Sequence, residues 1–266
     1  MAGAEGLTSV FARLAEWLKT LALETQEYVR LTIATFRAMF SPPFYRYDIV
    51  QQIDLIGVGS LTVVLLTGLF TGAALTLQGG MTLDQFGARP IVGRLVGASM
   101  IKELGPVLTA LMLTGRVGSG IAAELGSMVV TDQINALRAL GTDPIRKLGV
   151  PRVLAGILMA PILTVIADFV GIAGGWLVAR ARFQVPTGLY WSSVLQGLYM
   201  ADLWMGLIKP LVFGVLIVTI ACHVGLRARG GTQGVGKATT NAVVAASVAV
   251  VAAEFFVTQI LSSVLY

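Results

Sequence analysis

Charged side chains interrupt one of the apolar stretches of the sequence, ELGPVLTALMLTGRVGSGIAAELG at residues 103–126. Glu103, Arg116 and Glu124 lie among residues that are apolar enough for a lipid bilayer, while Pro106 and several glycines weaken the helix that they would form. Ionisable groups inside a membrane span are costly, and they usually face a bundle interior, an opposite charge or a wet pathway. The sequence therefore raises the question of what a membrane span gains from charges and breaks that cost stability.

Asp168, Lys209 and Glu254 are further ionisable residues in apolar surroundings. Two interpretations stay open for them and for Glu103. In the first, these residues are structural, as ion pairs or as side chains that reach the membrane interface. In the second, they belong to a transport pathway. Asp168 and Asp202 also raise the hypothesis of an intramembrane acid pair, but no catalytic motif accompanies them.

Nucleotide, metal and catalytic sites are not predicted. Residues 231–238, GTQGVGKA, imitate a nucleotide-binding loop, but Ala238 stands where Ser or Thr would hold Mg²⁺. Two apolar spans flank this segment and leave no room for the α/β sheet that such a loop needs. Cys222 and His223 are the only cysteine and histidine, which excludes an internal disulfide and leaves no credible metal site or catalytic triad. We therefore expect a non-enzymatic chain without a cofactor of its own.

The composition is that of an integral membrane protein. Hydrophobic residues make up 56% of the 266-residue chain and charged residues 12%, whereas a soluble globular protein carries roughly 25% charged residues. A helical span needs about 20 apolar residues, and the sequence predicts five: 55–77, 98–121, 153–179, 203–226 and 242–266. These runs are continuous and do not alternate in polarity as the strands of a membrane barrel would. The predicted fold class is all-α and polytopic.

A helix lying in the membrane interface is predicted near the amino terminus. Residues 7–21 place apolar side chains at helical spacing on one face and charged ones on the other. The alternative is an amphipathic helix packed on a soluble partner. Charged residues interrupt the first apolar positions, so we expect no cleavable signal peptide. The chain is predicted to be one domain, 1–266, with an interfacial region at 1–54 and a transmembrane bundle at 55–266.

The distribution of basic residues predicts the orientation of the spans. With a cytoplasmic amino terminus, 13 of the 19 Lys and Arg residues fall on the cytoplasmic side. Five spans then place the carboxyl terminus in the periplasm. The basic residues are spread among loops, so no nucleic-acid partner is expected. The other six lie on the opposite side or within spans: Arg89, Arg94, Lys102, Arg180, Arg182 and Lys209.

A short helix outside the bilayer is predicted between the second and third spans, at about residues 131–144. Thr131 is expected to cap this helix and Gly141 to end it, with Asp143-Pro144 starting another turn. An apolar stripe on such a helix suits a partner surface, and self-packing beneath the bundle is the alternative. The stripe consists of Ile134, Leu137 and Leu140.

Several motifs together resemble the MlaE/YrbE permeases of Mce-associated ABC transporters, which include lipid-asymmetry and toluene-tolerance systems. The resemblance covers nearly the whole chain in length and in the order of the spans. It implies a permease subunit that moves phospholipids or related lipids between the inner and outer membranes of bacteria. The motifs are ELGPVL at 103–108, GRVGSGIAAELGSM at 115–128, TDQINALRALGTDP at 131–144, VPR at 150–152 and GVGKATTNAVV at 234–244.

The resemblance also implies partners and a location. A homodimer is expected in the bacterial inner membrane, with two cytoplasmic ABC ATPase subunits that would bind ATP and Mg²⁺ and with a hexameric periplasmic ring of Mce-domain proteins. Residues 131–144 match the coupling helix of the family, which docks into the ATPase. The family commonly has acidic residues at positions 132 and 135, so Asn135 removes one charge from this surface. The predicted coupling residues are Thr131, Asp132, Ile134, Asn135, Leu137, Arg138, Leu140, Asp143 and Pro144.

The charged segment at 103–126 is expected to serve such a transporter. Glu103 and Pro106 would lie near the outer end of the second span and line a cavity that admits a lipid headgroup, with Leu75 and Gln78 at its outer mouth. Towards the cytoplasmic end, Arg116 and Glu124 are expected to pair with each other and to brace the coupling helix. The predicted structural or gating charges are Arg116, Glu124, Asp168, Lys209 and Glu254.

Two alternatives belong to other classes of function. An ion-coupled secondary transporter would use Glu103, Asp168 and Glu254 as coupling groups, and it would often show internal repeats, of which the sequence has no convincing example. It would also leave the cytoplasmic helix without a purpose. The second alternative is a membrane scaffold without a transport role, in which changes to the span charges would affect stability alone.

Overall fold

The computed structural model describes residues 2–265, except for the side chains of residues 2–15, 17, 18, 20 and 21. This part of the chain forms helices and no strand. Five of its helical segments are long and apolar enough to cross a membrane, which confirms the predicted all-α polytopic fold. They run over Arg46–Gln85, Arg89–Val130, Ile145–Phe183, Met200–Gly225 and Gly231–Leu265.

Each span is a single helix or a series of helical pieces. The third span joins the short η5 (Ile145–Gly149) to α8 (Val150–Phe183), and the fourth and fifth are α10 (Met200–Gly225) and α11 (Gly231–Leu265). The first consists of α2 (Arg46–Ile56), η1 (Val58–Ser60) and α3 (Leu61–Gln85). The second consists of η2 (Arg89–Ile91), α4 (Val92–Ser99), η3 (Met100–Leu104), α5 (Gly105–Leu113), η4 (Thr114–Gly118) and α6 (Ser119–Val130).

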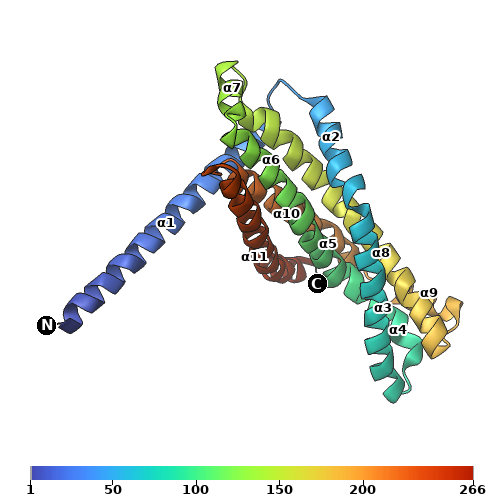
Figure 1. Ribbon diagram of the computed structural model, residues 1–266. Helices are drawn as coiled ribbons and strands as arrows, with labels where there is room; N and C mark the ends of the chain where they lie inside the picture. The colour runs from blue at the N-terminus through green and yellow to red at the C-terminus, as the bar shows by residue number, and fades with distance from the viewer. Residues whose placement is uncertain (1, 266) are drawn as a thin grey trace.

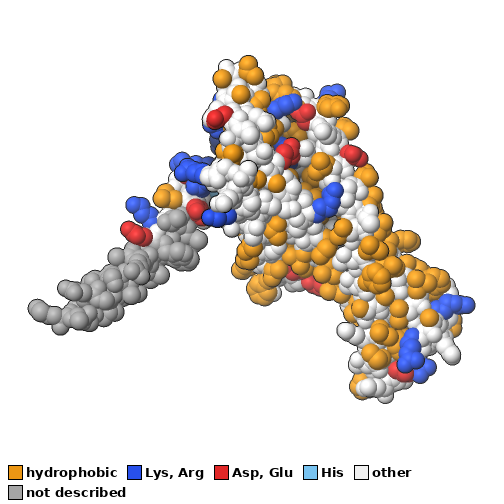
Figure 2. Space-filling view, viewed as in Figure 1, with side chains coloured by type: hydrophobic (Ala, Val, Ile, Leu, Met, Phe, Trp, Pro, Cys, Tyr) orange, Lys and Arg blue, Asp and Glu red, His pale blue; other side chains and the backbone are white. Residues whose placement is uncertain are grey.

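Three helices lie outside these spans (Figure 1). The helix α1 (Ala2–Met39) projects away from the bundle, and α7 (Gln133–Ala139) stands at one end of it. The helix α9 (Thr187–Gln196) lies at the opposite end, close to the turn between α3 and α4. We call these the α7 end and the α9 end. Figure 2 shows that apolar side chains cover much of the flank between them, as expected for a surface that faces lipid.

Glycines allow the first and third spans to pack closely. A side chain at Gly68 would collide with the backbone of Ala167, and one at Gly72 would collide with the carbonyl group of Gly171. The helices α3 and α8 therefore approach each other with their backbones almost in contact, as small residues permit in membrane bundles. This packing holds α3 against the bundle while its other face stays open.

The second span is wound as a π-helix in two places. The five-residue turns η3 and η4 carry Glu103 and Arg116, respectively. In η3, the N–H group of Gly105 donates to the carbonyl group of Met100, five residues earlier. Such π-turns are frequent at functional sites, because the extra residue redirects the side chains of the turn. The predicted weakening of this helix thus takes the form of two wide turns within a continuous span.

Three details differ from the sequence-based expectations. The amino-terminal helix extends from residue 2 to residue 39, beyond the predicted 7–21, and most side chains of the predicted interfacial stripe lie outside the described residues. The predicted boundary between residues 54 and 55 falls inside α2, which continues into the first span. The fifth span begins at Gly231, before the predicted residue 242, so the segment that imitates a nucleotide-binding loop forms the first turns of α11.

Candidate functional site

Lys209 of α10 is the centre of a charged cluster inside the bundle. Its side chain is fully buried, yet its ammonium group meets two carboxylates from other spans. Nζ lies 2.7 Å from Oε1 of Glu254 in α11 and 3.3 Å from Oε2 of Glu103 in η3. It also donates to the carbonyl oxygen of Lys102 at 2.6 Å. Three acceptors thus face the three N–H groups of one ammonium ion, which offsets the cost of burying its charge.

Pro106 explains why a backbone carbonyl group is available to Lys209. Proline has no N–H group to donate to the carbonyl four residues earlier, which is that of Lys102. The Lys209 ammonium donates to this oxygen instead. The Pro106 side chain itself is buried, so the expectation that it lines a cavity is wrong. Its ring packs inside the bundle, and its effect on the site passes through the backbone.

A second ion pair ties the same π-turn to the start of α10. The Lys102 ammonium lies 2.8 Å from Oδ1 of Asp202, a fully buried carboxylate. The other oxygen, Oδ2, accepts the N–H group of Tyr199 at 2.9 Å and caps α10. Asp202 therefore has a structural role, and the hypothesis that it forms an acid pair with Asp168 is wrong.

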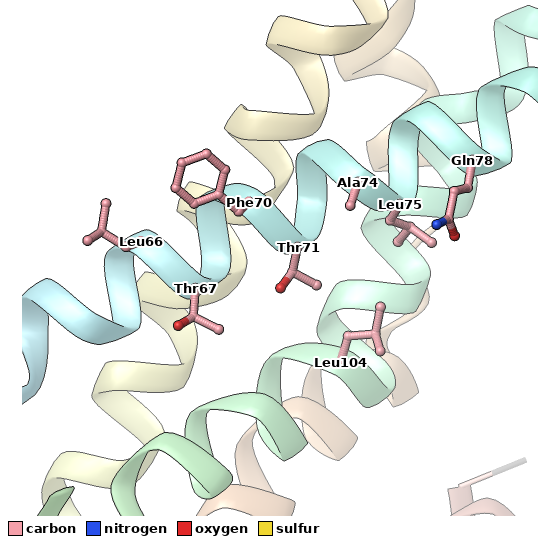
Figure 3. A pocket seen from close by; sticks show the side chains of 8 residues that line it. All are labelled: Leu66, Thr67, Phe70, Thr71, Ala74, Leu75, Gln78 and Leu104. Carbon is pink, nitrogen blue, oxygen red and sulfur yellow. The ribbon is translucent and has the colours of Figure 1, made fainter. Parts of the chain in front are cut away.

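A groove runs along the open face of α3 beside the charged cluster. It has a volume of about 520 Å³ and is mainly apolar. Figure 3 shows that Thr67, Thr71 and Leu104 point into the space between α3 and the second span. Leu104, which lines the groove, directly follows Glu103 in the chain, so the groove ends one residue from the charged cluster. The lining residues are Leu66, Thr67, Phe70, Thr71, Ala74, Leu75, Gln78 and Leu104.

A smaller pocket lies on the other side of the same turn, against α11. Its volume is about 340 Å³ and both carboxylates of the cluster line it. Thr258 donates its hydroxyl group to Oε1 of Glu254 at 3.1 Å. The Glu103 side chain is 47% exposed, whereas that of Glu254 is 15% exposed. Glu103 therefore lines the smaller pocket and is exposed enough to meet a ligand.

Of the residues predicted for the substrate cavity, Leu75 and Gln78 line the groove on α3 with Leu104, whereas Glu103 lines the smaller pocket. Of the predicted gating charges, Lys209 and Glu254 lie with Glu103 in the charged cluster. Asp168 does not. This residue is buried between α8 and the second span, where a side chain at Gly105 would collide with its carboxyl group.

Arg116 and Glu124 do not pair with each other, so that expectation is wrong. They are eight residues apart, more than two helical turns, and each has a nearer partner. The Arg116 guanidinium donates to the Leu55 carbonyl oxygen at 3.0 Å and to Oγ of Ser60 at 2.9 Å, beside the break between α2 and η1. Glu124 lies 2.7 Å from the guanidinium of Arg152, a buried residue at the start of α8. Both charges fasten the second span to a neighbouring span.

A helix is present as α7 within the segment predicted at about residues 131–144, but its cap differs from the expected one. Thr131 donates its hydroxyl group to the carbonyl oxygen of Ser127 in α6, and the residue at the cap position of α7 is Asp132 instead. Asp132 takes the position before the helix in a left-handed conformation, with φ 58°, and accepts a hydrogen bond from Asn135 at 3.0 Å. A second acid at position 135 would repel Asp132, whereas the amide donates to it. As predicted, Gly141 ends the helix with positive φ.

The apolar stripe of α7 is divided between the bundle and the surface. Ile134 is buried and packs on the bundle, and Pro144 is also buried. Leu137 is half-buried, whereas Leu140 is 80% exposed. Leu140 therefore offers the largest apolar contact to a partner. The exposed polar residues around it are Thr131, Asp132, Asn135, Arg138 and Asp143.

The turn after α7 is tied to the start of the first span. In η5, Lys147 pairs with Asp48 of α2, and its ammonium lies 4.3 Å from the centre of the Tyr45 ring. Arg146 donates to the carbonyl oxygen of Pro42 and to Oγ of Ser41 at 3.2 Å. Sequence reasoning missed these contacts, although the adjacent charges of Arg146 and Lys147 are a usable signal. The contacts join the segment after α7 to the connection between α1 and α2.

Among the described residues, no group of His, Cys, Asp and Glu side chains is arranged to hold a metal ion. Cys222 is buried in the core, and His223 packs edge-on against Tyr28 of α1 with ring centres 5.7 Å apart. Both residues therefore contribute to packing.

Comparison with known proteins gives consistent matches. The family model described as Permease MlaE matches residues 49–260. A probable ABC transporter permease of Rickettsia typhi is 40% identical over 85% of this chain and 88% of its own length. The intermembrane phospholipid transport system permease MlaE of Haemophilus influenzae is 38% identical over 85% and 88%, respectively. The chloroplastic protein trigalactosyldiacylglycerol 1 of Arabidopsis thaliana is 38% identical over 77% of this chain and 59% of its own.

Proposed function

The chain belongs to the MlaE permease family, and we propose that it is the membrane-spanning subunit of an ABC transporter that moves phospholipids between the inner and outer membranes. The observation that supports this proposal best is the placement of the Lys209 cluster next to the groove on α3. An apolar groove with charged and hydrogen-bonding groups at one point suits a molecule with acyl chains and a polar head. The Haemophilus relative is named as a permease of intermembrane phospholipid transport, which is the same class of cargo.

Different residues of the chain would bind the acyl chains and the headgroup of the lipid. Acyl chains would lie along α3, where Leu66 is 51% exposed and Phe70 66% exposed. The headgroup would meet the amide group of Gln78 and the exposed carboxylate of Glu103. Because Lys209 bonds to Glu103, to Glu254 and to the backbone of η3, a shift of α10 or α11 would change the position of Glu103. The cluster would thus link lipid binding to the packing of the spans.

ATP hydrolysis belongs to a partner subunit in this proposal, because the chain has no nucleotide-binding loop of its own. Two ABC ATPase subunits with ATP and Mg²⁺ would dock on α7 through Leu140 and the polar residues around it. The ties from η5 to Asp48 and Pro42 would pass the movement to the first span, which carries the lipid groove. The chain itself needs no cofactor.

A second copy of the chain is part of the proposal. Only 11% of the apolar window of α11 is buried within one chain, and Phe255 and Phe256 are both more than 60% exposed. A homodimer that covers this face would also close the two hollows beside Glu103 into one cavity. Orientation follows the basic residues, with α7 and the amino terminus in the cytoplasm and the α9 end towards the periplasm, where a hexameric ring of Mce-domain proteins would receive the lipid.

Native mass spectrometry tests this assembly. The chain would carry an affinity tag, be expressed with its neighbouring genes and be purified in a mild detergent. We expect two copies of this chain with two ATPase subunits, an Mce-domain assembly and retained phospholipid. A chain that is isolated without any ATPase would contradict the proposal and would favour an ion-coupled transporter or a scaffold.

A further inference from the structure

A second hollow lies at the α7 end of the bundle, where α10 ends and α11 begins. Its volume is about 510 Å³, and it is far more polar than the groove on α3. Arg227, Arg229 and Lys237 line it together with His223 and Asn241. Lys237 precedes Glu254 by 17 positions on α11, which places it roughly 25 Å along the helix from the Lys209 cluster. This basic groove is therefore a separate site.

The basic groove changes from charged to apolar along α11. Lys237, Asn241 and Ala245 follow one another at intervals of four residues, so they lie on one face of the helix. Lys237 is nearest to the start of α11, and Ala245 lies roughly 12 Å further along the span. A ligand that fills this groove meets cations near the membrane surface and alkyl groups further in. An anionic lipid has the same order of groups.

Two of the three cations are available to a ligand. Arg227 lies 2.6 Å from Glu27 of α1 and is engaged by that carboxylate. Arg229 and Lys237 form no ion pair within the described residues, and both side chains are exposed. One carboxylate, that of Glu24, also lines the groove. A guanidinium and an ammonium group together suit a phosphate oxyanion, to which both donate charge-assisted hydrogen bonds.

The helix α1 forms one wall of the basic groove and is held there. The hydroxyl group of Tyr28 lies 2.8 Å from that of Thr219 in α10, and the Tyr28 ring packs on His223. Figure 2 shows basic side chains gathered where α1 meets the bundle. The wall is therefore fixed by contacts on both α1 and α10, and the groove is part of the fold.

We propose that the basic groove binds the phosphate-bearing headgroup of an anionic lipid from the leaflet at the α7 end. Arg229 and Lys237 contact the phosphate, and an acyl chain lies along Ala245. The segment that imitates a nucleotide-binding loop thereby has a role, because its lysine holds the phosphate of a lipid and not that of a nucleotide. This inference depends on the membrane location of the chain and goes beyond the transport function proposed above.

Lipid binding to the purified complex tests the proposal. The double variant R229Q/K237Q removes both free cations, and R30Q/R37Q removes the same charge from exposed positions of α1 outside the groove. Native mass spectrometry would measure the binding of phosphatidylglycerol and of phosphatidylcholine with the same acyl chains. Inorganic phosphate would be tested separately. We expect about tenfold tighter binding of phosphatidylglycerol by the wild type and by R30Q/R37Q, and a loss of most of this preference in R229Q/K237Q.

Several results would overturn the lipid assignment. They are equal binding of the two lipids by the wild type, an unchanged preference in R229Q/K237Q, and binding of inorganic phosphate without phosphatidylglycerol. Release of the ATPase from R229Q/K237Q would assign this surface to a protein interface instead. The single variants R229Q and K237Q give the same test if the double variant does not fold. If the complex shows no preference for phosphatidylglycerol but still binds the ATPase, the basic groove proposal fails while the proposed transport function stands.

Discussion

The buried ammonium group of Lys209 lies 2.7 Å from the carboxylate of Glu254, and this contact joins the fourth and fifth spans in the middle of an apolar bundle. Two charges in such surroundings are stable only when each has a partner with good geometry. Lys209 has two carboxylates and a carbonyl oxygen. The cluster is therefore both an element of stability and the polar part of the candidate site, and the two roles can be separated by mutation.

Replacing Lys209 by Met should destabilise the protein by about 3 kcal/mol, because Glu254 and Glu103 would lose their shared cation. The double variant K209M/E254L removes the cation together with its more buried partner and should recover part of this loss. Thermal unfolding of the detergent-purified complex measures both. The prediction would be wrong if E254L lowered the stability of K209M as much as it lowers that of the wild type. The two side chains would then not depend on each other.

Pro106 makes the Lys102 carbonyl oxygen available to Lys209, so replacing it should loosen that contact. In P106A, the new N–H group can donate to the same oxygen and regularise the helix. We expect unfolding at an equal or higher temperature together with slower lipid transfer. Thermal unfolding and transfer from reconstituted vesicles measure the two effects. Transfer at the wild-type rate in P106A would exclude a role for this break in the transport cycle.

Gly72 tests the close contact between α3 and α8. A methyl group at this position would collide with the Gly171 carbonyl group, and G72A should therefore lower the unfolding temperature and the yield of folded protein. Gly120 is the matched control, since a side chain there meets open space. G120A should be neutral or stabilising by about 0.5–1 kcal/mol, as alanine favours a helix. Equal behaviour of the two variants would show that α3 and α8 separate easily.

The exposed leucine on α7 should hold the ATPase subunit. In L140D, a charge replaces the most exposed apolar side chain of the helix, and we expect loss of the ATPase during affinity purification with the fold intact. L137D should act in the same direction and more weakly, because Leu137 is half-buried. L195D provides the control, since Leu195 is 72% exposed on α9 at the other end. Retention of the ATPase by L140D would place the docking surface elsewhere.

Much of the fold could be predicted from the sequence, because continuous apolar runs leave few structures possible in a bilayer. The five spans and the helix at α7 follow from such runs and from turn residues such as Gly141. The side-chain pairings inside the bundle were harder to predict. Arg116 bonds to Leu55 and Ser60 because the first span happens to break beside it, and no local pattern reveals that neighbour.

The candidate site, too, could be predicted in part from the sequence. The sequence marked Glu103, Lys209 and Glu254 as unusual, since ionisable residues in apolar runs need a reason. It did not show that Lys209 would meet both acids while Asp168 lies elsewhere, because their distances depend on how three helices are rotated. One signal was available locally. Pro106 frees the carbonyl group of Lys102, which predicts a donor near that oxygen.

Transfer of lipid by the reconstituted transporter tests the central claim most directly. Vesicles that contain the complete complex, with fluorescent phospholipid, would be mixed with acceptor vesicles with and without ATP. We expect ATP-dependent transfer by the wild type and roughly tenfold slower transfer by E103K, with the ATPase subunits still bound, because a cation would face Lys209 and change the polar end of the groove. Transfer by E103K at the wild-type rate would contradict the assignment of Glu103 to the lipid site.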